Sequence, residues 1–245
     1  MESISISSGN TWAADPAIGY QIPREIILRA VGYRDPGSAG EETHSLIAEH
    51  LELAVSAAQP KAIYRATSFR LAGSDRVELP GGQVFTSAAL YRAAAGCEGL
   101  IVGLVTLGAG TDQAIAAASR QDAFCGYLTD TISSLLVEMA AHCFWQHLVF
   151  ELGQRGLKAT SFISPGAADF PLHEQKQVFA FLNPKRIGVK LTESCLMEPS
   201  KSLTVIMGYG KQIVQAKYSH DCSTCDMADC VIRGIHIALA ESNAG

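Results

Sequence analysis

Two long segments of the chain carry apolar residues at the three- and four-residue spacing of a helix. Residues 41–58 place Ile47, Leu51 and Ala54 on one side, while glutamates occupy much of the rest. Residues 121–155 form the longest such pattern, which Gly156 ends. The spacing predicts a surface helix with one buried face and, further along, a long central helix.

Other segments have the patterns of strands. Residues 99–108 are an almost continuous apolar run, which is typical of a strand buried on both faces, and residues 62–71 are rich in β-branched and aromatic side chains. In the C-terminal third, short strand patterns flank a single helix over residues 172–182, which Asp169 is placed to cap. The four strands expected there cover residues 158–163, 187–191, 203–207 and 212–217. Because these strands cluster without alternating helices, we expect an α+β fold with a mostly antiparallel sheet.

The chain has no internal repeat and no low-complexity linker. Its 245 residues, 48% of them apolar, are enough for one sizeable buried core and exclude general disorder. We therefore expect one domain over residues 22–245, preceded by a loose polar segment of residues 1–21.

The charge balance restricts the class of partner. A net charge of -5 and an isoelectric point of about 5.8 give no basic field that would collect the phosphates of a nucleic acid. The most apolar stretch, residues 99–110, is too short to cross a bilayer, and residues 1–10 lack a signal-peptide pattern. We expect a cytoplasmic protein with no nucleic-acid or membrane partner.

Cysteines near the C-terminus give the clearest chemical signal. Cys222 and Cys225 form a C-x-x-C turn that brings two thiolates to one metal ion, and Cys230 follows five residues later. Cys195 is the first candidate for a fourth ligand, and an exogenous ligand at an iron-sulfur cluster is the alternative. The spacing is compatible with an iron-sulfur cluster, with zinc, or with three reduced structural cysteines, and does not choose among them.

A glycine-containing turn at residues 108–112 follows the apolar strand and opens a helix that Thr111 is placed to cap. Such a turn offers backbone N–H groups to an anion, but a tight strand-to-helix connection needs glycine in any case. No Ser/His/Asp or Cys/His order indicates covalent catalysis, and no paired carboxylates indicate a glycosidase.

Two segments carry a family resemblance in their order and spacing. The first runs from Ser164-Pro165-Gly166 through Asp169 to Gln175, and the second covers residues 187–202 and contains Lys-Leu-Thr-Glu-Ser. Together with Glu138 and Asp130 upstream, they resemble the activation domain of vitamin B12-dependent methionine synthase. The resemblance extends from about residue 22 to the C-terminus.

The resemblance implies a single C-shaped α+β domain that binds S-adenosylmethionine and docks on a corrinoid protein, which carries the cobalamin. It implies a role in reductive reactivation, in which Co(II) takes one electron and then a methyl group. A stand-alone homologue would act as an accessory of a corrinoid methyltransferase, and whether it is itself an enzyme stays open. The residues that the resemblance places in the cofactor pocket are Glu138, Ser164, Pro165, Gly166, Asp169 and Met207.

Three positions depart from the family pattern. Phe162 stands where the family has an arginine, Ala167 replaces an aromatic residue, and Met207 replaces a tyrosine. Losing a charge-assisted arginine contact weakens binding by roughly 10- to 150-fold, so we expect millimolar rather than micromolar affinity for S-adenosylmethionine. Arg65, Arg70, Arg155 and Lys158 are the candidate replacements. The alternative functions are a metal-bearing redox or structural module and a ligand-binding protein that has lost the activation chemistry.

Overall fold

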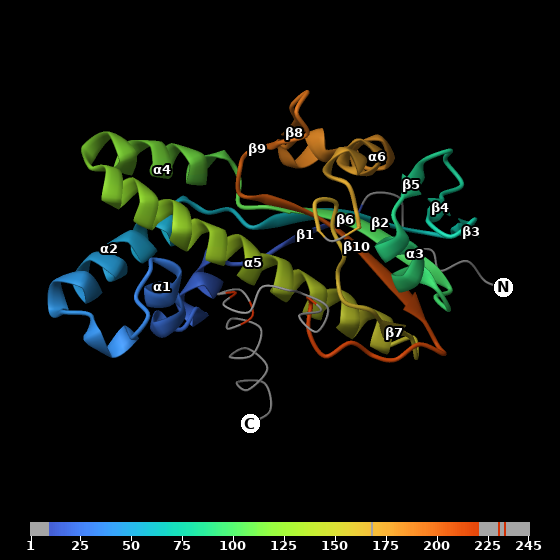
Figure 1. The fold of residues 1–245 in the computed structure, drawn as a ribbon, viewed down its shortest axis with the longest axis horizontal. Coiled ribbons are helices and arrows are strands. Elements are labelled where there is room, and N and C mark those ends of the chain that lie inside the picture. The colour runs from blue at the N-terminus through green and yellow to red at the C-terminus, as the bar shows by residue number, and fades with distance from the viewer. Residues whose placement is uncertain (1–9, 168, 221–229, 231–232, 234–245) are drawn as a thin grey trace.

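An antiparallel five-stranded sheet forms the centre of the molecule (Figure 1). The computed structural model describes residues 10–167, 169–220, 230 and 233. The strand order is β1-β2-β6-β10-β7, and every paired strand in it runs antiparallel to its neighbour. The strands are β1 (Asn10–Ala13), β2 (Lys61–Thr67), β6 (Gly99–Thr106), β10 (Ser202–Gly210) and β7 (Lys158–Ala159).

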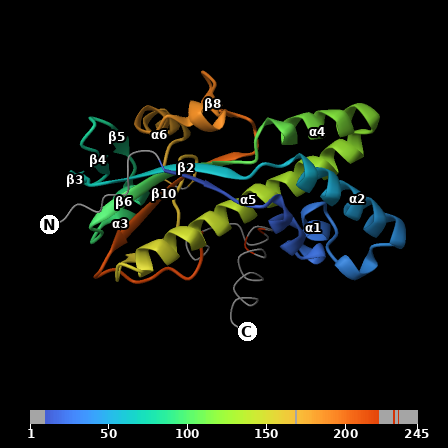
Figure 2. The same ribbon diagram turned by 180° about the vertical axis from the view of Figure 1, so that it is seen from behind.

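The long helix α5 (Ala123–Gly153) crosses one face of this sheet, and three further helices pack around its first half (Figures 1 and 2). These are α1 (Arg24–Ala30), α2 (Glu41–Ala57) and α4 (Ala109–Gln121), with the 3-10 helix η1 (Pro16–Gln21) beside α2. The mixed antiparallel fold and the long helix confirm the α+β class predicted from the sequence.

Smaller elements cover the other face of the sheet (Figure 1). They comprise α3 (Ala88–Ala94), α6 (Gln175–Phe181), the three-stranded sheet β3 (Arg70–Ala72), β4 (Arg76–Glu78) and β5 (Val84–Thr86), and the hairpin of β8 (Lys190–Leu191) and β9 (Met197–Glu198). The short 3-10 helices η3 (Leu172–Glu174) and η4 (Pro184–Ile187) flank α6, whereas η2 (Pro36–Ser38) lies beside α1.

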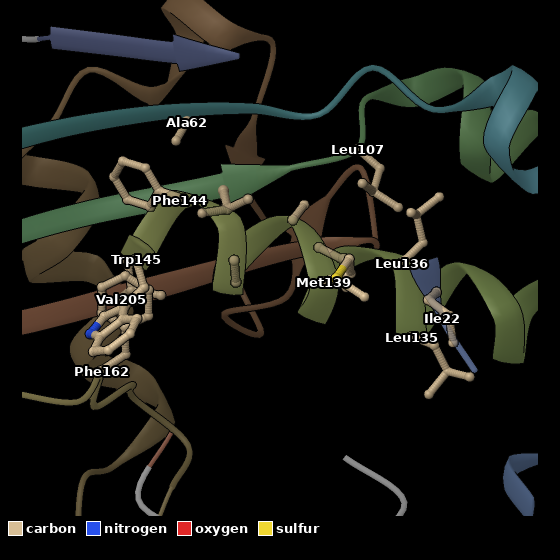
Figure 3. Packing of buried hydrophobic residues seen from close by; sticks show 14 of the residues in the cluster. Ile22, Ala62, Leu107, Leu135, Leu136, Met139, Phe144, Trp145, Phe162 and Val205 are labelled. Atoms are coloured by element: carbon tan, nitrogen blue, oxygen red, sulfur yellow. The ribbon is translucent and has the colours of Figure 1, made fainter. Parts of the chain in front are cut away.

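The sheet therefore has an apolar cluster on each face. All eight residues of β6 are buried, and its side chains alternate between the clusters: Ile101 and Val105 face α5, while Val102 and Leu104 face α6. On the α5 face, Leu136, Met139 and Phe144 of α5 belong to one apolar cluster (Figure 3), and the Phe144 ring lies 5.2 Å from that of Tyr64 on β2. Burial on both faces explains why β6 reads as a continuous apolar run.

The glycines of residues 108–112 have structural roles. Gly108 has a left-handed φ of 82° and precedes α4, which begins at Ala109, so the predicted cap Thr111 lies inside the helix instead. A Cβ on Gly110 would lie 2.5 Å from the backbone oxygen of Ala57. Close packing of α4 on the end of α2 thus requires glycine, and no anion is needed to explain it.

Three local predictions differ from the structure. Within the predicted loose segment, residues 10–13 pair with β2 and residues 16–21 form η1. Residues 212–217 form no strand: the Gln215 side chain accepts the N–H of Ala159 at 3.0 Å, and the Ala216 N–H donates to the Ala159 carbonyl at 2.9 Å. Asp169 does not cap a helix and lies beside Arg92 instead, at 3.4 Å.

Within the part of the chain that the structure describes, no helix has the length and apolar character needed to cross a membrane.

Candidate functional site

The two segments that carry the family resemblance meet at one hollow of about 350 Å³. Leu172 and Gln175, at η3 and the start of α6, form one side. The other side is formed by the β8–β9 hairpin and the residues after it, including Thr192, Leu196 and Ser200. This volume lies at the lower end of the range of small-molecule sites, which is about 300–1,000 Å³.

Gln175 is the most unusual residue of the hollow. Its side chain is 95% buried, since the residue exposes only 5% of its surface, yet its Oε1 has no hydrogen-bond partner. A buried polar group left unpaired costs about 1–3 kcal/mol. A buried amide oxygen without a partner is uncommon in native structures.

The turn of the hairpin is fixed by its own hydrogen bonds. Thr192 donates its N–H to the Leu196 carbonyl at 2.8 Å, and the Thr192 hydroxyl accepts the N–H of Leu196 at 3.0 Å. Cys195 has a left-handed φ of 63°, and its side chain is buried. This geometry holds Leu196 with 59% of its surface exposed at the rim of the hollow.

Charged residues on the helices anchor the chain that leaves the hollow. Asp112 of α4 accepts hydrogen bonds from the N–H and the hydroxyl of Ser200, at 2.9 and 2.7 Å. The buried ammonium of Lys201 lies 2.8 Å from Asp130 and donates to the Ser134 hydroxyl at 2.9 Å. The position of the hairpin thus depends on α4 and α5, although it packs on the opposite face of the sheet.

The Ser164-Pro165-Gly166 turn adjoins the hollow. Gly166 donates its N–H to the Phe170 carbonyl at 2.7 Å and has a φ of 97°, a conformation that favours glycine. A Cβ on Gly166 would lie 3.3 Å from Cδ1 of Leu172, which lines the hollow. The turn is therefore closed by its own backbone and packs directly against the rim.

Glu138 and Met207 do not line this hollow. Glu138 is half-buried on α5, and burial raises the pKa of its carboxyl to about 7. Met207 is fully buried in the apolar cluster on the α5 face, to which Phe162 also belongs. The Phe162 ring lies 6.1 Å from that of Phe144, and Figure 3 shows it beside Trp145 and Val205. These two predicted residues therefore lie outside the hollow, and the space beside Phe162 is filled with apolar side chains.

Two candidate replacements for the missing arginine already have partners. The Arg65 guanidinium lies 4.6 Å from the centre of the Phe181 ring, and Arg70 forms an ion pair with Glu78. Arg155 follows the end of α5, and Lys158 lies on the edge strand β7. None of the four lines the hollow.

The predicted metal site is only partly covered by the structure. Cys222 and Cys225 lie outside the described residues. Cys195 is buried in the hairpin turn, and Cys230 is half-buried. Among the described residues alone, no group of three potential ligands is close enough to hold a metal ion. Metal binding by the four cysteines therefore stays a prediction.

Sequence reasoning included Gln175 in the resemblance but did not identify it as a ligand-binding residue. Its unpaired Oε1 and its place beside residues 192–200 arise from tertiary packing, and no local pattern reveals them. The same holds for Asp112, whose partner Ser200 lies 88 residues away in sequence. Polar residues at turns are common, so neither position stands out from its neighbours alone.

Comparison with known proteins gives a relation at the level of the fold. No known family model matches the sequence, and no curated protein matches it. Among solved structures, the chain is similar to the crystal structure of the MetH reactivation domain bound to AdoHcy, with a TM-score of 0.63 and 16% sequence identity. The match covers 82% of this chain and 78% of that one. The protein therefore has the fold of a MetH reactivation domain.

Proposed function

We propose that this protein binds S-adenosylmethionine and assists the reductive reactivation of a separate corrinoid protein. The supporting observation is the extensive fold match to a reactivation domain that was crystallised with AdoHcy. The two segments that resemble the activation domain of methionine synthase converge at one hollow, which gives the resemblance a physical location.

In this proposal the corrinoid partner contributes the cobalt and this chain contributes the methyl donor. The Co(II) centre takes one electron from an external reductant and becomes Co(I). Co(I) then attacks the methyl group of S-adenosylmethionine, forming a methyl–cobalt bond and releasing S-adenosylhomocysteine. The role of this chain is to hold the donor and to present it to the partner.

The described residues supply the donor site only in part. Glu138 is an acid that could pair with the ammonium of the ligand once it is ionised, since its pKa lies near 7. Ser164, Pro165, Gly166 and Asp169 lie on the loop beside the hollow, but Phe162 offers an apolar ring where a cation is needed for the carboxylate. Weak binding, at about the millimolar level, follows from this loss.

A reconstitution assay tests the proposal. A corrinoid methyltransferase holding cob(II)alamin is mixed with titanium(III) citrate and S-adenosylmethionine, with and without this protein. We expect this protein to accelerate the appearance of the methylcobalamin absorbance, with one S-adenosylhomocysteine released per cobalt methylated. Equal rates of methylcobalamin formation with and without this protein, when this protein and S-adenosylmethionine are at saturating concentrations, would contradict the proposed role.

A further inference from the structure

We infer that the helical end of the molecule carries a docking surface for a partner protein that presents arginine or lysine side chains. This acidic aromatic surface consists of residues on η1, α2 and the first turns of α5: Tyr20, Glu49, Glu52, Phe124 and Tyr127. The three elements pack together on the α5 side of the sheet (Figures 1 and 2). The hollow lies on the opposite face, so the inference is independent of the proposed function.

Helix α2 carries a negative charge that the fold leaves unbalanced. It contains four exposed glutamates and neither lysine nor arginine. Glu41 and Glu42 lie in the first turn, where the helix dipole favours an acidic side chain. Glu49 and Glu52 lie beyond that turn and gain nothing from the dipole. Within the described part of the chain, no cation forms an ion pair with any of the four, so a cationic partner would be complementary to them.

Tyr20 places an exposed aromatic ring beside the second pair of glutamates. It exposes 50% of its surface, and its hydroxyl donates to the Glu52 carboxylate. Glu49 lies three residues before Glu52, so the two carboxylates are neighbours on one side of α2. The ring and both carboxylates thus face a partner together.

Two further aromatic rings are exposed at the start of α5. Phe124 and Tyr127 each expose 48% of their surface, and their ring centres are 6.4 Å apart. The Tyr127 hydroxyl donates to the carbonyl of Ala30 at the end of α1, at 3.3 Å, which holds the ring in place. Large aromatic residues that stay exposed side by side are typical of protein interfaces, where tyrosine and phenylalanine are enriched.

Packing of α2 on α5 brings Glu49 to the same end of α5. His50, the next residue, has its Nδ1 2.8 Å from the hydroxyl of Thr129. Desolvation and the charges of Asp122 and Glu49 raise the pKa of the Cys125 thiol, so Glu49 lies within electrostatic reach of the first turn of α5. The exposed rings and the carboxylates therefore lie on one connected surface.

Aromatic rings combined with carboxylates select a cationic side chain. An arginine guanidinium stacks on an aromatic face and donates hydrogen bonds to a carboxylate, and a lysine ammonium does so with less geometric fit. A nucleic acid or an anionic membrane would be repelled by the same glutamates. The partner that fits this surface is accordingly a protein with a basic segment.

A basic peptide tests the inference on the unmodified protein. We expect a fluorescently labelled, arginine-rich peptide to bind in an anisotropy titration, and the peptide with citrulline in place of arginine to bind at least about tenfold more weakly. A photoreactive form of the arginine peptide should cross-link to the acidic aromatic surface. Equal binding of the two peptides, or cross-links confined to other surfaces, would overturn the inference.

Two pairs of glutamate substitutions separate a specific surface from general attraction. Glu49→Gln combined with Glu52→Gln should weaken peptide binding at least about threefold. Glu41→Gln combined with Glu42→Gln changes the net charge equally and should have a smaller effect. Equal weakening by the two double variants would show that the net charge alone attracts the peptide and would overturn the inference. S-adenosylmethionine binding should be the same in both, because neither pair lines the hollow.

Aromatic substitutions on α5 test the contribution of the rings. Phe124→Ser and Tyr127→Ser should each weaken peptide binding at least about twofold, because each removes one cation–π contact. Phe150→Ser is the matched control, since Phe150 exposes 63% of its surface at the other end of the same helix. Binding that falls equally in the Phe150→Ser variant, or that is unchanged in all three, would contradict the role of these rings.

Discussion

The carboxylate of Asp112 accepts two hydrogen bonds from Ser200, one from its N–H at 2.9 Å and one from its hydroxyl at 2.7 Å. Asp112 lies in the first turn of α4, and Ser200 follows the hairpin that closes the hollow. This contact joins the helical layer on one face of the sheet to the ligand-sized space on the other.

Replacing Asp112 by alanine should loosen the hairpin more than the rest of the fold. Hydrogen bonds to a charged group contribute about 1.5–3 kcal/mol, and partial exposure here reduces the expected loss of unfolding free energy to about 1–2 kcal/mol. Urea denaturation measures this loss. Hydrogen exchange should show faster exchange of the amides at residues 192–200, whereas uniform acceleration across β6 would mean that the contact has no local role.

Lys201 and Asp130 should respond unequally to substitution. The Lys201 side chain is 11% exposed and that of Asp130 is 50% exposed. Asp130→Ala leaves a buried ammonium without its counter-charge, whereas Lys201→Met leaves a carboxylate that water can reach. We expect Asp130→Ala to lower the unfolding free energy by about 1–3 kcal/mol and Lys201→Met by less than about 1 kcal/mol. Denaturation of both variants checks the order, and the reverse order would contradict this description of the pair.

Glu138 and His142, one helical turn apart on α5, should affect the pH dependence of stability in opposite directions. Burial raises the pKa of Glu138 from 4.5 to about 7, so the native state binds its proton more tightly than the unfolded state does. This contribution is fully present below pH 4.5 and is lost as the pH rises through 7. Burial lowers the pKa of His142 from 6.5 to about 4, so its contribution is present above 6.5 and is lost as the pH falls through 4.

The Glu138→Gln variant isolates the first of these effects. Because glutamine does not ionise, the variant should gain stability relative to the unmodified protein as the pH rises from 4.5 to 7, by about 1–3 kcal/mol. Thermal or urea unfolding at several pH values measures the difference. A difference that does not change with pH would show that Glu138 titrates normally.

Metal analysis tests the cysteine prediction. Protein purified without oxygen should contain one zinc ion or one iron-sulfur cluster per chain, and iron would give a broad absorbance near about 400 nm. Cys225→Ser should remove the metal, and Cys195→Ser should do so if Cys195 is the fourth ligand. Cys97→Ser is the control, because burial raises the pKa of the Cys97 thiol to about 11 and disfavours the thiolate that a metal requires. A metal-free preparation of the unmodified protein would remove the hypothesis.

The sequence predicted the elements whose burial is dictated by their own pattern. Residues 99–106 form β6 as expected, and the helix expected over residues 121–155 is α5, from Ala123 to Gly153. Prediction from the sequence failed where a residue distant in sequence determines the local structure. The segment over residues 212–217 has a strand-like composition, yet Gln215 binds β7 through its side chain and Val214 remains 88% exposed.

In the candidate site, too, features set by local sequence could be predicted and features set by distant contacts could not. The turn at Ser164–Gly166 could be recognised locally, because proline and glycine set its backbone. The hollow could not, since it forms only where Leu172 and Gln175 meet the hairpin. The filling of the α5 face by Phe162 and Met207 is likewise a property of packing, because both residues belong to a cluster contributed by distant elements.

Binding of S-adenosylmethionine to the isolated protein tests the central claim most directly. Calorimetry should show saturable 1:1 binding with a dissociation constant of about 1 mM, tighter at pH 8 than at pH 6 because Glu138 is ionised above its pKa of about 7. The absence of saturable heat at both pH values, with ligand at about ten times that concentration, would contradict the account.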